Sequence, residues 1–166
     1  MFRTRLLILL LSLAIVSGCG YGFTIRGQGE APKLRLLNTK NDTTLVDADI
    51  MLDTNLQQQM SMFGILSLKK EDPAVKCTVL SYSTMETTSN MSNVTRYKIT
   101  LQVKVQVLDI VGNQLWGSSF SDEGTYELGQ EMSTAVNIAC NNVSNQIAQA
   151  LMSVKMNQPV NAAPAK

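Results

Sequence analysis

The sequence predicts an α+β fold, a two-layer sandwich in which a four-stranded mixed sheet carries two helices on one face. Strict apolar alternation from Tyr97 to Val107 indicates a half-buried strand. Apolar residues recur every three or four positions in two other segments, which indicates two amphipathic helices. The order is strand, helix, strand, strand, strand, helix, so a parallel crossover precedes an antiparallel meander. The sheet face opposite the helices would be uncovered.

The strand from Tyr97 to Val107 has its apolar residues at odd positions and its polar residues at even positions. Such a strand has one face on a core and the other in water or against a polar partner. The segment 109–113 carries the Gly-Asn pair of a hairpin turn, and Gln114 to about Tyr126 is predicted to return. In this register Trp116 and Phe120 lie on the same face as Val103 and Val107. Glu123 and Glu127 lie on the opposite face, near Arg96, Lys98 or Thr100.

Two further strands are expected upstream. Val75 to about Thr88 alternates more weakly and leads into a polar hairpin tip at Ser89 to Asn93. Pro73 stands just before it, where no ladder donor is required. A short apolar piece from Lys33 to Leu37 is predicted to be the first strand.

The first helix is predicted from Asp47 to Phe63, with Gly64 placed to end it. Its apolar positions are Ile50, Leu52 or Asp53, Leu56, Met60 and Phe63. The second helix is predicted from about Glu131 to Met156. Its apolar positions are Met132, Val136, Ala139, Val143, Ile147, Ala150 or Leu151, and Val154. Its other side is polar but almost uncharged, which leaves two alternatives: contact with a partner, or simple exposure.

The N-terminal segment has the features of a bacterial lipoprotein signal peptide. Arg3 and Arg5 precede an apolar run from Leu6 to Val16, which is too short to span a bilayer. The sequence Ser17-Gly18-Cys19 resembles a lipobox, in which the cysteine is acylated and becomes the first mature residue. A transmembrane anchor and ordinary secretion with an incidental cysteine are the alternatives, and the short run and the lipobox favour lipidation at Cys19.

The domain boundaries follow from these features. Residues 1–18 are predicted to be the signal peptide, residues 19–157 one α+β domain, and residues 158–166 a disordered tail rich in proline and alanine. Basic and acidic residues number 14 and 13, so no overall field attracts nucleic acid.

Composition argues against catalysis. Histidine is absent, which excludes Ser-His-Asp and Cys-His enzymes and removes the commonest nitrogen ligand for metals. No Walker-type phosphate loop and no dinucleotide-binding fingerprint is present. Asp122 and Glu123 are adjacent on a predicted strand, so their carboxylates would point to opposite faces rather than act together. We therefore expect no enzyme activity, no cofactor and no metal site.

Two cysteines remain once Cys19 is acylated. An exported protein meets an oxidising compartment, where Cys77 and Cys140 could form a disulfide that adds roughly 4 kcal/mol in the ideal loop-closure model. Two buried free thiols are the equally weighted alternative.

Most of the chain after the signal resembles the LptE family of lipopolysaccharide-assembly lipoproteins. The segment from Cys19 to Gly27 reads CGYGFTIRG, Asn55 to Met60 reads NLQQQM, and Gly64-Ile65 follows. The strand that begins YKITLQV at Tyr97, the turn near Gly112 and the polar helix near Glu131 come next, in the order typical of the family. The resemblance implies an outer-membrane lipoprotein that plugs the β-barrel LptD, assists its assembly and helps deliver lipopolysaccharide to the outer leaflet.

The resemblance also implies a location and a ligand. Gly20, where no aspartate follows the lipidated cysteine, fits sorting to the outer membrane, on its periplasmic face. Basic residues bind lipopolysaccharide in the family, and the candidates in this chain are Arg96, Lys98 and Lys104, with Lys76 on the preceding strand. The alternative is that Glu123 and Glu127 neutralise them across the sheet. The family's basic position near the hairpin tip has no match in Ser89 to Asn93.

A second functional hypothesis remains open. A lipoprotein regulator or structural subunit of another envelope complex, such as a peptidoglycan synthase activator, would use the same anchor and a similar sandwich. A long disordered linker after the lipid would favour that hypothesis. Ordered structure is predicted to begin near Lys33, which favours a domain close to the membrane.

Overall fold

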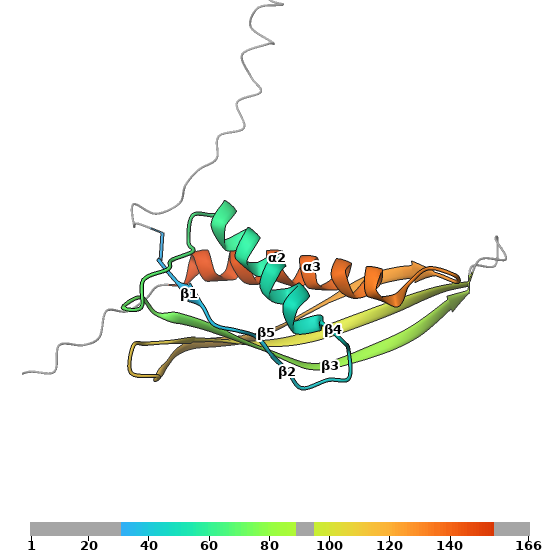
Figure 1. The fold of residues 1–166 in the computed structure, drawn as a ribbon, viewed down its shortest axis with the longest axis horizontal. Coiled ribbons are helices and arrows are strands. Elements are labelled where there is room, and N and C mark those ends of the chain that lie inside the picture. The colour runs from blue at the N-terminus through green and yellow to red at the C-terminus, as the bar shows by residue number, and fades with distance from the viewer. Residues whose placement is uncertain (1–30, 89–94, 155–166) are drawn as a thin grey trace, which may run out of the picture. The chain divides into compact units, whose positions relative to one another are not determined.

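The computed structural model describes residues 31–88 and 95–154 (Figure 1). The signal peptide, Cys19, the hairpin tip at Ser89 to Asn93 and the C-terminal tail therefore lie outside the described residues. The elements of the described part, in chain order, are β1 (Arg35–Leu36), β2 (Lys40–Asn41), α2 (Ala48–Met62), β3 (Ala74–Thr88), β4 (Thr95–Leu108), β5 (Gln114–Glu127) and α3 (Met132–Ser153).

The predicted α+β fold and its element order are confirmed. The long strands β3, β4 and β5 form an antiparallel meander, and β1 and β2 both pair in parallel with the free edge of β3. The helices α2 and α3 cover one face of this mixed sheet, and the other face is bare in the described part of the chain (Figure 1). None of the described helices combines the length and the hydropathy needed to cross a membrane.

The first strand differs from its prediction. A continuous strand was expected from Lys33 to Leu37, but the edge strand consists of two short pieces, β1 and β2, and the second was not predicted. The break between them is held by α2, because the Asp53 carboxylate accepts hydrogen bonds from the Thr39 backbone N–H at 3.1 Å and from the Thr39 hydroxyl at 2.6 Å. Thr39 therefore bonds the helix, and the edge strand resumes only at Lys40.

The predicted register of the β4–β5 hairpin is confirmed. Val103 lies opposite Phe120 and Val107 opposite Trp116, so both aromatic rings join the apolar face of β4. Period-two alternation puts successive side chains on opposite faces, which is why one correct pair fixes the rest of the strand.

The core lies between the sheet and the two helices. The odd positions of β4 from Ile99 to Val107 are fully buried, as predicted. On α2 the prediction was wrong at Ile50, which is 61% exposed; the buried face runs through Ala48, Leu52, Leu56 and Met60. The buried residues of α3 are Ala135, Val136, Ala139, Cys140, Val143, Ser144, Ile147, Ala148 and Leu151.

Candidate functional interface

One face of the sheet, which we call the open face, is covered by no helix in the described part of the chain (Figure 1). It consists of the side chains that alternate away from the helices on the three long strands. On β3 they are Lys76, Thr78, Ser81, Ser83, Met85 and Thr87; on β4, Arg96, Lys98, Thr100, Gln102, Lys104 and Gln106; on β5, Leu115, Gly117, Ser119, Ser121, Glu123, Thr125 and Glu127. Hydroxyl and amide side chains dominate this surface, so it is polar without being strongly charged.

Charges at one end of the open face are paired. The Lys98 ammonium lies 2.8 Å from a carboxylate oxygen of Glu123, and the Arg96 guanidinium lies 3.2 Å from Glu127. Two of the three predicted lipopolysaccharide-binding residues are therefore engaged across the strands, as the alternative interpretation of the sequence expected. Such exposed pairs contribute about 0–1 kcal/mol each to stability.

The other end of the open face is basic, and we call Arg35, Lys76 and Lys104 the basic end. Lys104 lies opposite Thr78, and Lys76 lies opposite Gln106, so the two lysines are diagonal neighbours on adjacent strands. Among the described residues, neither lysine forms a salt bridge. Of the three predicted binding residues, Lys104 alone belongs to this end.

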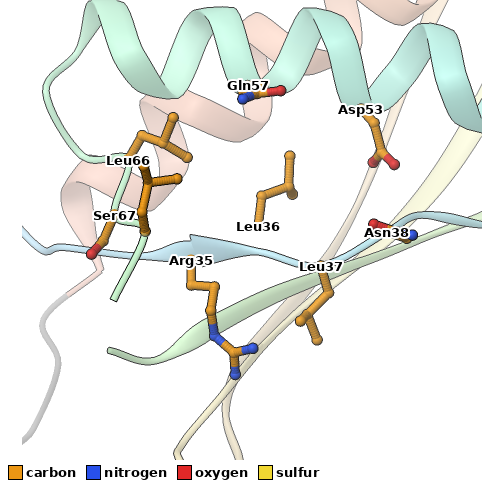
Figure 2. A pocket seen from close by; sticks show the side chains of 9 residues that line it. Arg35, Leu36, Leu37, Asn38, Asp53, Gln57, Leu66 and Ser67 are labelled. Carbon is orange, nitrogen blue, oxygen red and sulfur yellow. The ribbon is translucent and has the colours of Figure 1, made fainter. Parts of the chain in front are cut away.

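Arg35 joins the basic end through the parallel pairing of β1. It lies opposite Ala74, two residues before Lys76 on β3, and its side chain extends from β1 away from α2 (Figure 2). Its Nε atom is buried and has no hydrogen-bond partner among the described residues. Sequence reasoning missed Arg35, because β1 pairs with a strand on the far side of the crossover helix, and such a register leaves no local signal in the sequence.

The polar side of α3 is explained by contacts within the chain. Towards α2, Asn55 donates to the Asn137 side chain at 3.0 Å, and Gln59 lies 3.5 Å from that of Asn141. Towards β5, Asn142 donates to the backbone oxygen of Glu123 at 3.1 Å, and Gln146 donates to Asp122 at 2.5 Å. These amide side chains have hydrogen-bond partners on the neighbouring elements, which explains why this side of α3 is polar but almost uncharged. This contact pattern removes the main reason to expect a partner on that helix, and the open face remains the candidate interface.

A small cavity of about 230 Å³ lies between β1 and α2 (Figure 2). Leu36 and Leu66 contribute apolar surface, and Gln57 and Asp53 lie along its helical side. The Asp53 carboxylate is already engaged by Thr39. No group of three or more His, Cys, Asp or Glu side chains that could hold a metal ion occurs within residues 31–88 and 95–154.

Cys77 and Cys140 are buried free thiols, so the disulfide alternative is wrong in this structure. Burial raises the pKa of Cys77 to about 12; the negative charge of Asp53 adds to this and a hydrogen bond with Thr39 opposes it. Burial also raises the pKa of Cys140 to about 12, and its Sγ lies 3.7 Å from the Ala48 carbonyl oxygen. Protonated, buried thiols are poor nucleophiles, so both residues act as core side chains.

Comparison with known proteins identifies similar folds. Neither a family model nor a curated protein sequence matches the chain. The hypothetical protein CT253 from Chlamydia trachomatis superposes with a TM-score of 0.51 at 11% identity, over 74% of this chain and 96% of that one. This likeness shows a shared fold and no more.

Two other solved structures are less similar. A minor lipoprotein from Acinetobacter baumannii gives a TM-score of 0.49 at 20% identity, over 74% of this chain and 92% of that one. The PelC dodecamer protein from Paraburkholderia phytofirmans gives 0.48 at 13% identity, over 78% and 96%. Membership of the LptE family therefore stays a prediction from the residues.

Proposed function

We propose that this protein is an outer-membrane lipoprotein, anchored through Cys19, that plugs the lumen of an LptD-type β-barrel and helps to deliver lipopolysaccharide to the outer leaflet. The observation that carries the proposal is the open face, which is long, polar and uncovered in the described part of the chain. The resemblance to the LptE family supplies the identity of the barrel and of the cargo.

The chemistry of the open face suits the interior of a barrel. The lumen of an outer-membrane barrel is polar and wet, in contrast to its apolar outer band. A plug therefore needs side chains that hydrogen-bond to a polar wall or to water. Ser81 and Gln102 already bond each other at 3.0 Å, and the neighbouring hydroxyl and amide side chains have the same character.

The length of the sheet also suits this role. The longest strand, β3, has 15 residues, which corresponds to about 50 Å of extended chain. A membrane barrel has an apolar band about 25 Å tall. A sheet of this length can contact the inner wall of such a barrel over its full height.

The basic end is the part of the open face best suited to the phosphates of lipopolysaccharide. Arg96 and Lys98 already have carboxylate partners, so recruiting them would require two ion pairs to break. Lys104 and Lys76 form no such pair among the described residues, and a phosphate would accept charge-assisted hydrogen bonds from both. We therefore place lipopolysaccharide contact at Lys104, Lys76 and Arg35.

The decisive test is affinity purification from membranes in mild detergent, followed by mass spectrometry of stoichiometric partners. A large outer-membrane β-barrel is the expected partner. Ser121→Trp, midway along β5 on the open face, should abolish its recovery. Asn145→Trp, on the exposed side of α3, is the matched control and should leave recovery unchanged, because among the described residues the Asn145 side chain bonds only Gln149, on its own helix.

Two outcomes would contradict the proposal. Recovery of a peptidoglycan synthase in place of a barrel would support a regulator of another envelope complex. If Ser121→Trp still recovers the barrel and Asn145→Trp does not, the interface with the barrel lies on α3 instead of the open face. Circular dichroism of both variants checks that loss of the partner is not loss of the fold.

A further inference from the structure

The turn between β4 and β5 presents two apolar side chains to solvent. Ile110 and Val111, which we call the apolar tip, are 70% and 78% exposed. The turn is held from inside: Asp109 Oδ1 accepts hydrogen bonds from the backbone N–H of Val111 at 2.9 Å and of Asn113 at 2.8 Å. Gly112 has φ 93°, which glycine adopts without strain. The polar residues thus fix the turn, while the apolar pair faces outward.

The apolar tip lies at the end of the sheet where the described chain begins. Leu108, the last residue of β4, lies opposite Ala74, and Ala74 lies opposite Arg35 at the start of β1. Because β1 runs parallel to β3, the chain reaches Arg35 from this same end, which Figure 1 shows. Leu68, 88% exposed in the segment that leads into β3, belongs to this end as well.

The expected lipid anchor is attached to this end by a short stretch of sequence. Eleven residues separate Cys19 from Ala31, the first described residue. A chain of that length extends at most about 40 Å. If Cys19 carries acyl chains in a leaflet, the end of the sheet that holds the apolar tip is the end attached nearest to that leaflet.

The loops around the apolar tip carry balanced charge. Their three basic residues, Lys33, Lys69 and Lys70, are matched by three acidic ones, Glu71, Asp72 and Asp109. The basic end lies on the open face of this same end of the sheet. Lys33 Nζ donates to the Gly64 carbonyl oxygen at 2.7 Å, and Asp72 accepts from Ser67. The apolar tip itself can therefore contact a membrane only through its apolar side chains, and the basic end can add attraction to anionic lipid.

We propose that the apolar tip, together with Leu68, inserts into the interface of the phospholipid leaflet that holds the acyl chains of Cys19, and so fixes the orientation of the domain on the membrane. This inference rests on the lipid anchor of the proposed function. It adds a second, protein-borne membrane contact. Apolar groups at the end of a rigid turn gain free energy by leaving water for the interface.

The test uses the full-length lipidated protein reconstituted into phosphatidylcholine vesicles whose acyl chains carry bromine, which quenches tryptophan fluorescence at short range. The chain has one tryptophan, so Trp116→Phe removes the background. In that variant, Val111→Trp reports from the apolar tip. Leu128→Trp reports from the far end of β5, where Leu128 is 72% exposed and thus a matched position.

The expected result is at least twofold stronger quenching at position 111 than at position 128. Adding Ile110→Ser should reduce the quenching at position 111, whereas Ile138→Ser, on exposed α3 surface, should not. Quenching at position 111 should already be present with phosphatidylcholine alone, before any phosphatidylglycerol is added.

Flotation of the protein with the vesicles separates the two proposals. Flotation with equal or absent quenching at both positions would overturn insertion of the apolar tip and leave the anchor intact. Quenching that appears only with anionic lipid would overturn the apolar mechanism. Failure to float would overturn lipidation at Cys19, and this inference with it.

Discussion

Gly124 of β5 lies directly beneath Ala135 of α3, with no room for a side chain between them. A Cβ atom at position 124 would overlap the Ala135 carbonyl oxygen and lie 3.0 Å from the Ala139 backbone nitrogen. Gly124 is buried, and it pairs with Ile99, the first buried residue of the β4 core face. The backbone of α3 therefore rests on the backbone of β5, and this contact sets the spacing of helix and sheet.

Gly124→Ala should destabilise the protein by about 1–3 kcal/mol or more, because α3 must move to admit the methyl group. Gly117→Ala on the same strand is the matched control. Its Cβ would meet mainly the Gln114 side chain, which can rotate away, so the expected loss is below about 1 kcal/mol. Urea unfolding followed by circular dichroism measures both. Equal losses would mean that α3 does not rest on position 124.

Asp53→Ala should cost about 1–3 kcal/mol, because it leaves the Thr39 N–H and hydroxyl without their acceptor at the break between β1 and β2. Asp49→Ala is the control on the same helix, since the Asp49 side chain accepts no hydrogen bond in the described part of the chain. It removes only an acidic group from the first helical turn, worth about 0.3–1 kcal/mol. Similar unfolding free energies for the two variants would contradict this role for Asp53.

The buried thiols should make stability fall at alkaline pH. Both pKa values rise from 9.0 to about 12 on folding, so below pH 9 the thiols are protonated in both states. Above pH 9 the thiols ionise in the unfolded state but stay protonated in the folded state. The free energy of unfolding therefore falls by about 1.4 kcal/mol per thiol per pH unit until about pH 12. Between pH 8 and pH 10 the wild type should lose about 1.4 kcal/mol more than Cys77→Ala or Cys140→Ala. Identical pH dependence in all three proteins would contradict burial of neutral thiols.

The sequence was most informative where structure is local. Alternation fixed β4, and the Gly112-Asn113 turn then determined the pairing of Val103 with Phe120, because period two leaves one register once a turn is placed. Gly64, with φ 66°, follows α2 and its C-cap residue Phe63, close to where the spacing predicted the helix to end.

Features that depend on distant contacts could not be predicted in the same way. The break at Thr39 exists because Asp53 reaches it from another element, and Arg35 joins Lys76 only through a parallel register set after a helix. The amides of α3 looked like an unused polar surface because their partners, such as Asn55 and Glu123, are far away in the chain. The candidate site was therefore predicted only partly, with Lys104 on the correct face and its neighbours unknown.

Lys104→Gln and Lys98→Gln should separate ligand binding from sheet stability. Lys104 has no acidic partner among the described residues, so its loss should weaken binding of purified lipopolysaccharide about tenfold, the value of one charge-assisted hydrogen bond. Lys98 is held by Glu123, so its loss should change affinity less than about threefold. Both variants should unfold within about 1 kcal/mol of the wild type, since exposed ion pairs contribute little. Titration at two salt concentrations checks the electrostatic origin, because Lys104→Gln should reduce the salt dependence. Equal weakening by both variants would mean that the Lys98 pair opens for the ligand and that binding is not confined to the basic end.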